Sequence, residues 1–164
     1  MSQGIYPQIT QITQILADSC QGGEYTPPMS SQPPAPIPAE YADLFEKRAI
    51  AHVATLMPDG SPQVTPVWIM REGDLLVINS ARGRLKDKNL RRDGRIAIEI
   101  MDPENTGRYL TVRGTVVEIT EADGDAIIDA LSMKYTGNPS YKWRSKSEIR
   151  VTYRIRPERV SGSD

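Results

Sequence analysis

The sequence predicts a mainly β domain with short helices, in which about six antiparallel strands close into a barrel. Two observations support this prediction. Short apolar runs rich in β-branched residues recur along the chain, and hairpin-type turns such as PDGS (58–61) and REGD (71–74) separate them. Antiparallel strands of this number and spacing favour closure over an open sheet with exposed edges. No alternation of strand, helix and strand is present, which argues against a doubly wound parallel sheet.

Residues 1–36 are interpreted as a flexible, proline-rich tail, and residues 37–164 as the domain itself. The segment 24–38 contains six prolines, which build neither a helix interior nor a strand ladder and favour extended chain. This composition is typical of a linker, or of sequence that lies upstream of a start at Met29.

A short helix and a three-stranded meander open the predicted domain. The helix is expected over 38–48, where apolar residues recur at helical spacing on one face. Strands follow at 49–57, 62–70 and 75–80, connected by the two turns. Because the middle strand carries two prolines, which cannot donate backbone hydrogen bonds, we expect it at a sheet edge or at the mouth of the barrel.

The remaining elements are predicted, in order, as a basic helix at 82–93, strands at 95–101 and 108–120, a helix at 120–135 and a last strand at 148–156. The last strand is the clearest, because apolar and polar residues alternate along it. Gly114 marks either a bulge or a close approach of another segment. The spacing from Thr120 to Asp123 is typical of a capping box that starts the second helix.

Composition argues against several classes of enzyme. The chain has 164 residues, a net charge of −1, one cysteine and one histidine. It therefore lacks an internal disulfide, and a histidine-rich zinc site, a Ser-His-Asp triad and a Cys-His dyad are badly supported. No apolar run reaches the roughly 18 residues that cross a bilayer, and no basic residue precedes Lys47. We expect a cytoplasmic protein without membrane association, whose chemistry as an enzyme would come from a bound cofactor.

Positive charge is concentrated in one short stretch. Residues 82–95 hold seven basic side chains against two acidic ones, although the whole chain is slightly acidic. The residues alone leave three interpretations open: a solvated helix face, a nucleic-acid surface, or a site for a small, highly charged ligand. The overall acidity and low aromatic content argue against nucleic acid. A strand-to-helix junction with Asn79 and Ser80 just ahead of Arg84 and Lys86 has the parts of a phosphate site.

The strand at 62–70 is expected to lie beside the strand at 75–80 in the meander. A ring system attached to a phosphate held at Ser80 and Lys86 would then lie along the 62–70 strand. Its heteroatoms would meet free backbone groups of Gln63, Val64, Thr65 and Val67.

The run HVATLMPDGSPQVTPVW, followed by LLVINSARGRLKDKNLRRDGRIAI, resembles the pyridoxamine 5'-phosphate oxidase-like family of FMN-binding split β-barrels. It is similar in particular to the branch of that family that uses the deazaflavin coenzyme F-420. The resemblance covers residues 40–160. It implies a Greek-key-like, six-stranded antiparallel split barrel, and a homodimer with two cofactor sites at its interface.

The resemblance also implies a set of site residues. The coenzyme phosphate would be held by Asn79, Ser80, Arg84 and Lys86, with Asn89 in support. The isoalloxazine-type ring would be lined by Gln63, Val64, Thr65, Pro66 and Val67. The ring would be covered from the partner chain by Tyr141 and Trp143, which otherwise pack at the dimer interface. The polyglutamate tail of coenzyme F-420 would be screened by Arg82, Lys88 and Arg91.

The implied function is hydride transfer between coenzyme F-420 and an unsaturated small molecule that serves as electron acceptor, with no catalytic side chain and no metal ion. One alternative is an FMN-dependent enzyme of the pyridoxamine-phosphate oxidase type, although the sequence shows no second basic cluster for a substrate phosphate. Another is a non-catalytic protein that binds a flavin or deazaflavin. His52 is interpreted as a structural residue, and Tyr109 either reaches the site or packs.

Overall fold

The computed structural model describes residues 33–145 and 147–163. Its elements in chain order are η1 (Ala39–Phe45), β1 (Ala51–Leu56), β2 (Pro62–Val67), β3 (Ile69–Glu72), β4 (Leu75–Ala81), α2 (Leu85–Arg92), β5 (Arg95–Met101), β6 (Tyr109–Thr120), α3 (Gly124–Thr136) and β7 (Arg150–Ser163). The predicted mainly β architecture is confirmed, with seven strands in the described chain rather than six.

Most of the predicted tail, including Met29, lies outside the described residues. The interpretation of Met29 as a start therefore stays a prediction. The part that is described, residues 33–36, runs beside the last strand. There the backbone N–H of Ala35 donates to the carbonyl of Pro157 at 2.8 Å. The boundary between tail and domain stays a prediction.

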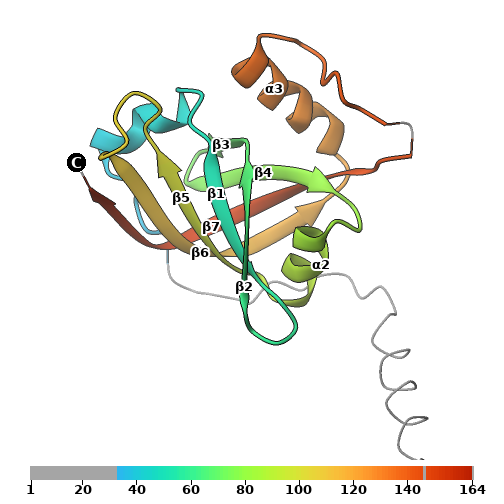
Figure 1. Cartoon of the computed structure of the whole chain (residues 1–164), viewed down its shortest axis with the longest axis horizontal. Coiled ribbons are helices and arrows are strands. Elements are labelled where there is room, and N and C mark those ends of the chain that lie inside the picture. Colours follow the sequence, from blue (N-terminus) through green and yellow to red (C-terminus); the bar gives the residue numbers. More distant parts are fainter. Residues whose placement is uncertain (1–32, 146, 164) are drawn as a thin grey trace, which may run out of the picture.

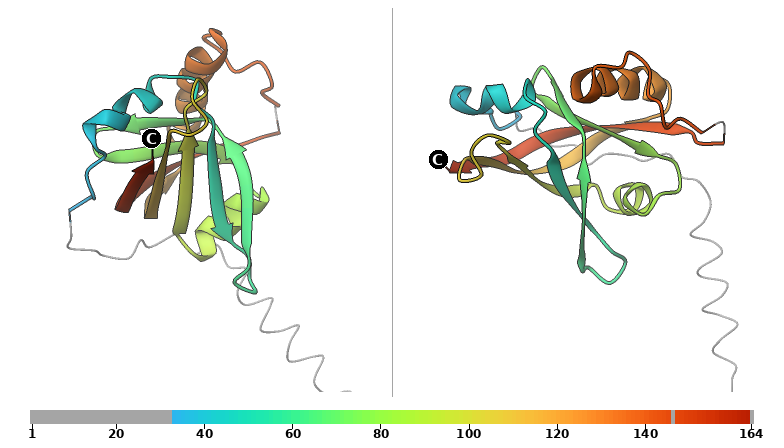
Figure 2. Two further views of the ribbon diagram at one scale, coloured as in Figure 1. Left: turned by 60° about the vertical axis from the view of Figure 1, so that its left-hand side comes forward. Right: turned by 45° about the horizontal axis from the view of Figure 1, so that its top comes forward.

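The strands of the described chain form one antiparallel sheet in the order β2-β1-β5-β6-β7-β4-β3. β2 and β3 therefore lie at opposite edges of the sheet, although Trp68 alone separates them in the chain. A sheet whose two edges are joined by a single residue must curl round on itself. This constraint produces the split barrel that is seen from three directions in Figures 1 and 2.

The structure corrects the prediction of one strand at 62–70 beside the strand at 75–80. β2 pairs with β1 and not with β4, whereas β3 pairs with β4, beginning with Ile69 opposite Ile78. The reason is the break at Trp68, whose ring stacks on Tyr135 with 5.1 Å between the ring centroids. The edge position that the prolines of β2 predict is confirmed.

Two apolar clusters lie on the two faces of β4. Ile78 packs inside the barrel, where α2 contributes Leu90 and η1 contributes Leu44. Val77 points to the other face and packs on α3, so α2 and α3 lie on opposite sides of this strand (Figure 2). Each large side chain buried in these clusters stabilises the fold by about 1.5–3 kcal/mol.

The helices differ in detail from their predictions. The expected helix at 38–48 is a 3-10 helix over Ala39–Phe45. The helix expected at 120–135, α3, begins at Gly124, four residues later than the Thr120 start expected from the capping-box spacing. At Gly124 a Cβ would lie 2.3 Å from the carbonyl oxygen of Arg150, so the helix can start against β7 only with glycine there. The carboxylate of Asp123 accepts from Arg154 at 2.6 Å and makes no capping bond.

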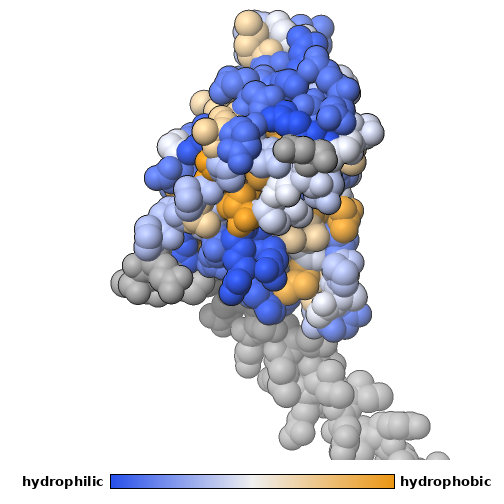
Figure 3. Space-filling model, turned by 90° about the vertical axis from the view of Figure 1, so that its left-hand side faces the viewer, coloured by the Kyte–Doolittle hydropathy of each residue, from blue (hydrophilic) through white to orange (hydrophobic). Residues whose placement is uncertain are grey.

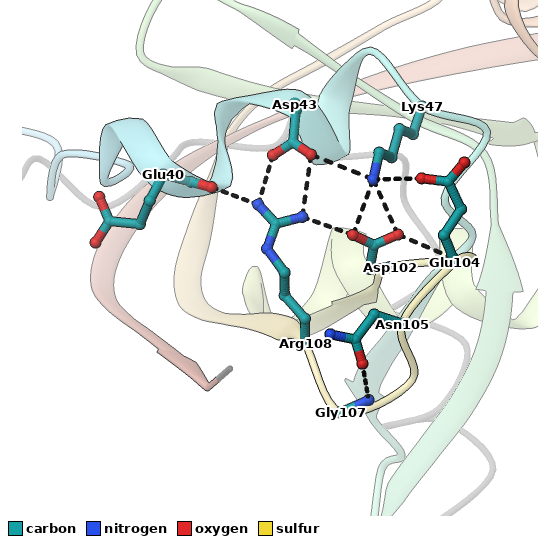
Figure 4. A network of polar contacts seen from close by, with 8 residues as sticks. All are labelled: Glu40, Asp43, Lys47, Asp102, Glu104, Asn105, Gly107 and Arg108. Atoms are coloured by element: carbon teal, nitrogen blue, oxygen red, sulfur yellow. Dashed lines mark hydrogen bonds and ion pairs between the residues drawn. The ribbon is translucent and has the colours of Figure 1, made fainter.

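A network of ion pairs joins η1 to the turn between β5 and β6 (Figure 4). Its centre is the buried carboxylate of Asp102, which accepts from the backbone N–H of Glu104 at 2.9 Å, from Lys47 at 2.9 Å and from Arg108 at 2.6 Å. Arg108 also bonds to Asp43 at 2.6 Å. The N–H of Glu104, together with the two cations, holds the pKa of Asp102 well below its usual range.

The surface on the side of η1 and the C-terminal end of β7 is mostly hydrophilic. Hydrophobic residues appear there only in small, separate areas (Figure 3). Among the helices of the described chain, none is long and apolar enough to cross a membrane.

Lys134 attaches α3 to the rest of the barrel. Its ammonium group donates to the carbonyl oxygen of Phe45 at 2.5 Å and to that of Ile69 at 2.9 Å. Burial lowers the pKa of Lys134 to about 8, because the charged form loses hydration. The charged form of Lys134 is therefore less favourable in the folded protein than in the unfolded chain.

Replacing Asp102 by Asn should lower the melting temperature at pH 7, because Lys47 and Arg108 lose their shared carboxylate. A depressed pKa contributes stability above the unfolded value of 3.8, and this contribution disappears as the pH falls through the folded value. Thermal unfolding from pH 7 to pH 2 should therefore show the gap between wild type and variant narrowing in acid. Asp74→Asn is the control, because the carboxylate of Asp74 is exposed and its ion pair with Arg71 is longer, at 3.5 Å. Its loss should change the melting temperature much less. A gap that stays constant with pH would contradict this assignment.

Lys134 should make stability rise with pH. Between the folded pKa of about 8 and the unfolded value of 10.5, the unfolded chain binds a proton that the folded chain does not, so the free energy of unfolding increases. Urea unfolding at pH 7.5, 8.5 and 9.5 should show this increase in the wild type and a flatter profile in Lys134→Met. Parallel profiles would show that Lys134 titrates normally.

Candidate cofactor site

A pocket of about 200 Å³ lies where the end of β2 meets β4, the start of α2, and the segment between α3 and β7. Seven of the residues predicted from the sequence line it: Pro66, Val67, Asn79, Arg84, Lys86, Tyr141 and Trp143. Residues separated by up to 77 positions in the chain, from Pro66 to Trp143, thus meet in one place. The curl of the sheet makes this possible, because it brings the end of β2 close to β4.

One wall of the pocket is cationic. Arg84 precedes α2, Lys86 lies in its first turn, and Arg150 begins β7. The only carboxylate paired with this group in the described chain is that of Glu148, which bonds to Arg84 and lies 3.3 Å from Arg150. Three positive charges therefore meet one negative charge.

Lys86 has no acidic partner among the described residues. It is partly buried, and burial lowers its pKa, with further lowering by the charges of Arg84 and Arg150. An unpaired ammonium group in such surroundings is costly unless an anion accompanies it. The wall is thus suited to a ligand with a compact negative charge.

Arg150 is the member of this wall that the sequence did not reveal. Its Nε donates to the Oδ1 of Asn79 at 2.7 Å, and the Nδ2 of Asn79 donates to the carbonyl of Gly124 at 2.8 Å. Asn79, expected to hold phosphate, therefore orients Arg150. The alternation of β7 placed Arg150 on the polar face of the strand, and nothing in the pattern showed that α3 covers that face.

The second wall is aromatic. The rings of Trp68, Tyr141 and Trp143 contact one another with centroids 5.5–6.3 Å apart. The guanidinium of Arg150 lies 5.2 Å from the centre of the Tyr141 ring, so the two walls meet there. Trp143 is 64% exposed and forms the outer end of this wall. Tyr141 and Trp143 thus line the pocket of their own chain, whereas the sequence assigned them to the site of a partner.

The other predicted residues do not line this pocket. Ser80 follows Asn79 and points to the opposite face of β4, into the barrel, where its hydroxyl has no hydrogen-bond partner among the described residues. Asn89 donates to Thr55 at 3.0 Å and so joins α2 to β1. The remaining three lie upstream on β2: Gln63, Val64 and Thr65.

Most of the cations of the basic stretch have local partners. Arg82 bonds to Glu121 at 2.6 Å, Arg91 to Asp87 at 2.9 Å, and Arg95 to Asp93 at 2.6 Å. Arg92 donates to the carbonyl of Leu56. Within the described chain, Lys86 and Lys88 are the two members of the stretch without an acidic or backbone partner. The local excess of charge is therefore much smaller than the sequence suggests.

The buried carboxylate of Asp87 fixes the start of α2. It accepts from the N–H of Gly83 at 2.7 Å and from the hydroxyl of Tyr153 at 2.5 Å. Burial, together with this carboxylate, raises the pKa of Tyr153 far above its usual value, so the hydroxyl stays protonated and donates. These bonds hold Arg84 and Lys86 in place relative to the barrel.

Asp129 on α3 holds the segment that carries Tyr141 and Trp143. It accepts from the backbone N–H of Tyr141 at 2.8 Å and from the guanidinium of Arg144 at 2.8 Å. Arg144 also reaches Asp125 at 2.6 Å. Asp129 thus attaches the segment that carries Tyr141 and Trp143 to α3 through one carboxylate.

Two other residues considered in the sequence lie away from the pocket. His52 is on β1, and its Nδ1 lies 2.8 Å from the carboxylate of Glu99 on β5, which is consistent with a structural role. Tyr109 starts β6 and does not line the pocket. The described chain contains no group of three or more His, Cys, Asp or Glu side chains that could hold a metal ion.

Comparison with known proteins gives the family. A model described as pyridoxamine 5'-phosphate oxidase matches residues 37–164. The chain belongs to the pyridoxamine 5'-phosphate oxidase family. A solved structure described as an F-420 reductase is 32% identical, with a TM-score of 0.69, and the alignment covers 76% of this chain and 98% of that one.

Other members of the pyridoxamine 5'-phosphate oxidase fold are more distant. A conserved hypothetical protein from Mycobacterium tuberculosis is 24% identical, with a TM-score of 0.62 and coverage of 83% of this chain and 89% of that one. The HupZ protein of Group A Streptococcus is 24% identical, with a TM-score of 0.56 and coverage of 79% and 98%. At this identity they support the fold alone. The comparison with curated proteins gives no match.

Asp129→Ala should release the segment that carries Tyr141 and Trp143 from α3. The helix itself should not be weakened, because alanine is a good helix former. A hydrogen bond to a charged group contributes about 1.5–3 kcal/mol, so the segment should open about tenfold more often. Trypsin should then cut faster after Lys142 and Arg144, as measured by mass spectrometry of the intact protein. Asp125→Ala, which removes only one contact of Arg144, should change the rate much less. Equal rates in both variants would count against Asp129 as the main attachment.

Proposed function

We propose that this protein binds coenzyme F-420 and transfers hydride between the coenzyme and an unsaturated small molecule that acts as electron acceptor. The observation that best supports this proposal is the state of Lys86 in the pocket that it shares with Arg84 and Arg150. Its ammonium group is partly buried and has no acidic partner in the described chain. A coenzyme phosphate would complete these surroundings. The 32% identity to an F-420 reductase supports the choice of coenzyme.

The size of the pocket indicates how the coenzyme would lie. A volume of about 200 Å³ suits a phosphate and its neighbouring atoms but falls below the roughly 300–1,000 Å³ of sites for whole ligands of this kind. The ring would extend beyond the pocket along residues 63–67 of β2, whose outer edge has no strand partner in the described sheet. A second copy of the chain would cover the exposed side of the ring, so we propose a homodimer.

The residues of this chain would bind and orient, and none is assigned as a nucleophile. The cations Arg84, Lys86 and Arg150 would hold the phosphate, and Asn79 would keep Arg150 in position. Trp68 and Tyr141 would exclude water from the adjoining wall, which strengthens the charge interactions beside them. The bound coenzyme would supply the hydride chemistry, while the protein fixes where its ring lies relative to the acceptor.

Lys88 favours coenzyme F-420 over FMN. It is exposed, lies one helical turn beyond Arg84, and has no acidic partner among the described residues. It could screen a polyglutamate tail, which FMN lacks, with a contribution well under about 1 kcal/mol. Arg82 and Arg91 are less suited to this role than the sequence suggested, since Glu121 and Asp87 already engage them. An FMN-dependent oxidase and a non-catalytic binder remain the alternatives.

Replacing Arg84 and Lys86 together by Gln should weaken coenzyme binding at least about 100-fold, because each charged hydrogen bond to phosphate contributes about 1.5–3 kcal/mol. Fluorescence titration of the purified protein with coenzyme F-420 and with FMN measures this. The matched control is Arg82→Gln/Arg91→Gln, which removes two charges that are already paired. Unchanged affinity in the Arg84/Lys86 variant would overturn the site, and tighter binding of FMN would overturn the choice of coenzyme.

Turnover separates the enzyme from a simple binder. Bound coenzyme, reduced beforehand, should be reoxidised by at least one member of a panel of quinones, enones and nitro compounds, followed by absorbance. Binding without reoxidation by any acceptor would favour the non-catalytic alternative.

A further inference from the structure

A second, larger pocket lies elsewhere on the barrel and shares no residue with the candidate cofactor site. It has a volume of about 460 Å³ and is lined from β1, β2, β5, β6 and β7. A neighbouring pocket of about 550 Å³ shares Arg113, Glu158 and Arg159 with it. These three side chains therefore lie at the junction of two open spaces.

The register of the sheet brings two arginines together at this junction. Arg113 on β6 lies directly opposite Arg159 on β7, whereas the next residue, Gly114, lies opposite Pro157. Glu158 is thus an extra residue, and the strand bulges there. Consecutive residues of a regular strand point to opposite faces, but here Glu158 and Arg159 line the same two pockets. The bulge is what places Arg159, rather than Glu158, opposite Arg113.

Like charges directly opposite on neighbouring strands destabilise a sheet. Neither Arg113 nor Arg159 has an acidic partner in the part of the chain that the structure describes. The nearby Glu158 is already engaged, since its carboxylate accepts from Thr115 at 2.9 Å and from Arg156 at 3.1 Å. The fold therefore holds two exposed arginines at opposite positions of neighbouring strands, and no carboxylate of the described chain neutralises them.

The rest of the larger pocket is lined by Arg95, which bonds to Asp93 at 2.6 Å, by apolar side chains and by the bare backbone of Gly114. Ala54, Leu56 and Ala97 form its apolar side. Gly114 has no side chain because a Cβ there would lie 2.4 Å from the carbonyl oxygen of Arg156. The pocket thus combines apolar side chains with two arginines, Arg113 and Arg159, that have no acidic partner among the described residues.

We propose that Arg113 and Arg159 form a second anion-binding site, for a small molecule with an apolar body and one phosphate or carboxylate group. The anion would bridge the two guanidinium groups, each of which can donate two parallel hydrogen bonds, and would offset their repulsion. The apolar body would lie against the alanines. This site is independent of the proposed coenzyme and of its pocket.

Phenyl phosphate is a suitable probe, with benzyl alcohol as its uncharged counterpart. The titrations are made by isothermal calorimetry on the full chain carrying Arg84→Gln/Lys86→Gln, so that the cofactor site cannot contribute. Phenyl phosphate should bind, benzyl alcohol should not, and adding Arg113→Gln/Arg159→Gln should weaken binding at least tenfold. Arg71→Gln, which changes an arginine on β3, should leave binding unchanged. No binding of phenyl phosphate, or equal binding after the two arginines are replaced, would overturn the proposal.

A measurement without ligand tests the same site by a different route. In low-salt buffer Arg113→Gln should melt at a higher temperature than the wild type, because it removes the repulsion. Phenyl phosphate should then raise the melting temperature of the wild type more than that of the variant. A variant that is less stable without ligand would show that Arg113 has a structural partner, against the proposal.

The anion could instead be a carboxylate of a second copy of this chain. Light scattering at several protein concentrations distinguishes the two sources. The proposal expects the same oligomeric state in the wild type and in Arg113→Gln/Arg159→Gln. Dissociation of the variant would show that the two arginines bind a second copy and would overturn the small-molecule site.

Discussion

Trp68 joins the two edges of the sheet, and the candidate cofactor site depends on how this residue is held. Its ring stacks on Tyr135, whose hydroxyl donates to the carbonyl of Ala49 at 2.6 Å and accepts from the N–H of Ile69 at 3.2 Å. The chain is thus anchored to α3 just before β1 and just after the break. Because β2 must stop where β3 begins, its end is brought close to β4 and the start of α2. The pocket forms at that meeting point.

Most of the positive charge that the sequence concentrates in residues 82–95 is paired with acidic groups or backbone carbonyls in the folded protein. The basic stretch looks like one positive surface, but acidic side chains from the loops and from α2 itself engage most of it. What remains is specific: Lys86 in the pocket and Lys88 on the helix surface. An isolated ammonium group that is partly buried is a stronger indication of an anionic ligand than a larger number of exposed cations, because only the buried one loses its hydration.

The two proposed anion sites are built by different structural devices. At the first, Asp87 and Tyr153 fix the start of α2, and Asn79 orients Arg150, so each cation is positioned by a buried neighbour. At the second, a single extra residue in β7 places Arg159 opposite Arg113. In both cases the unneutralised cations destabilise the fold without a ligand, and an anionic ligand would complete the balance of charge.

Local patterns in the sequence determined where the strands lie, except that β2 and β3 were predicted as one strand, and also the edge position of β2 and the close approach at Gly114. Alternation, proline and glycine act within a few residues of where they stand. The motif around Arg84 and Lys86 also indicated one wall of the pocket. Tertiary structure alone decided the break at Trp68, the burial of Arg150 under α3 and the meeting of Arg113 with Arg159. Each of these depends on which strand lies beside which, or on which face a helix covers. Pairing between segments far apart in the chain leaves no periodic signal in either segment, so these features emerge only when the sheet curls and its register is set.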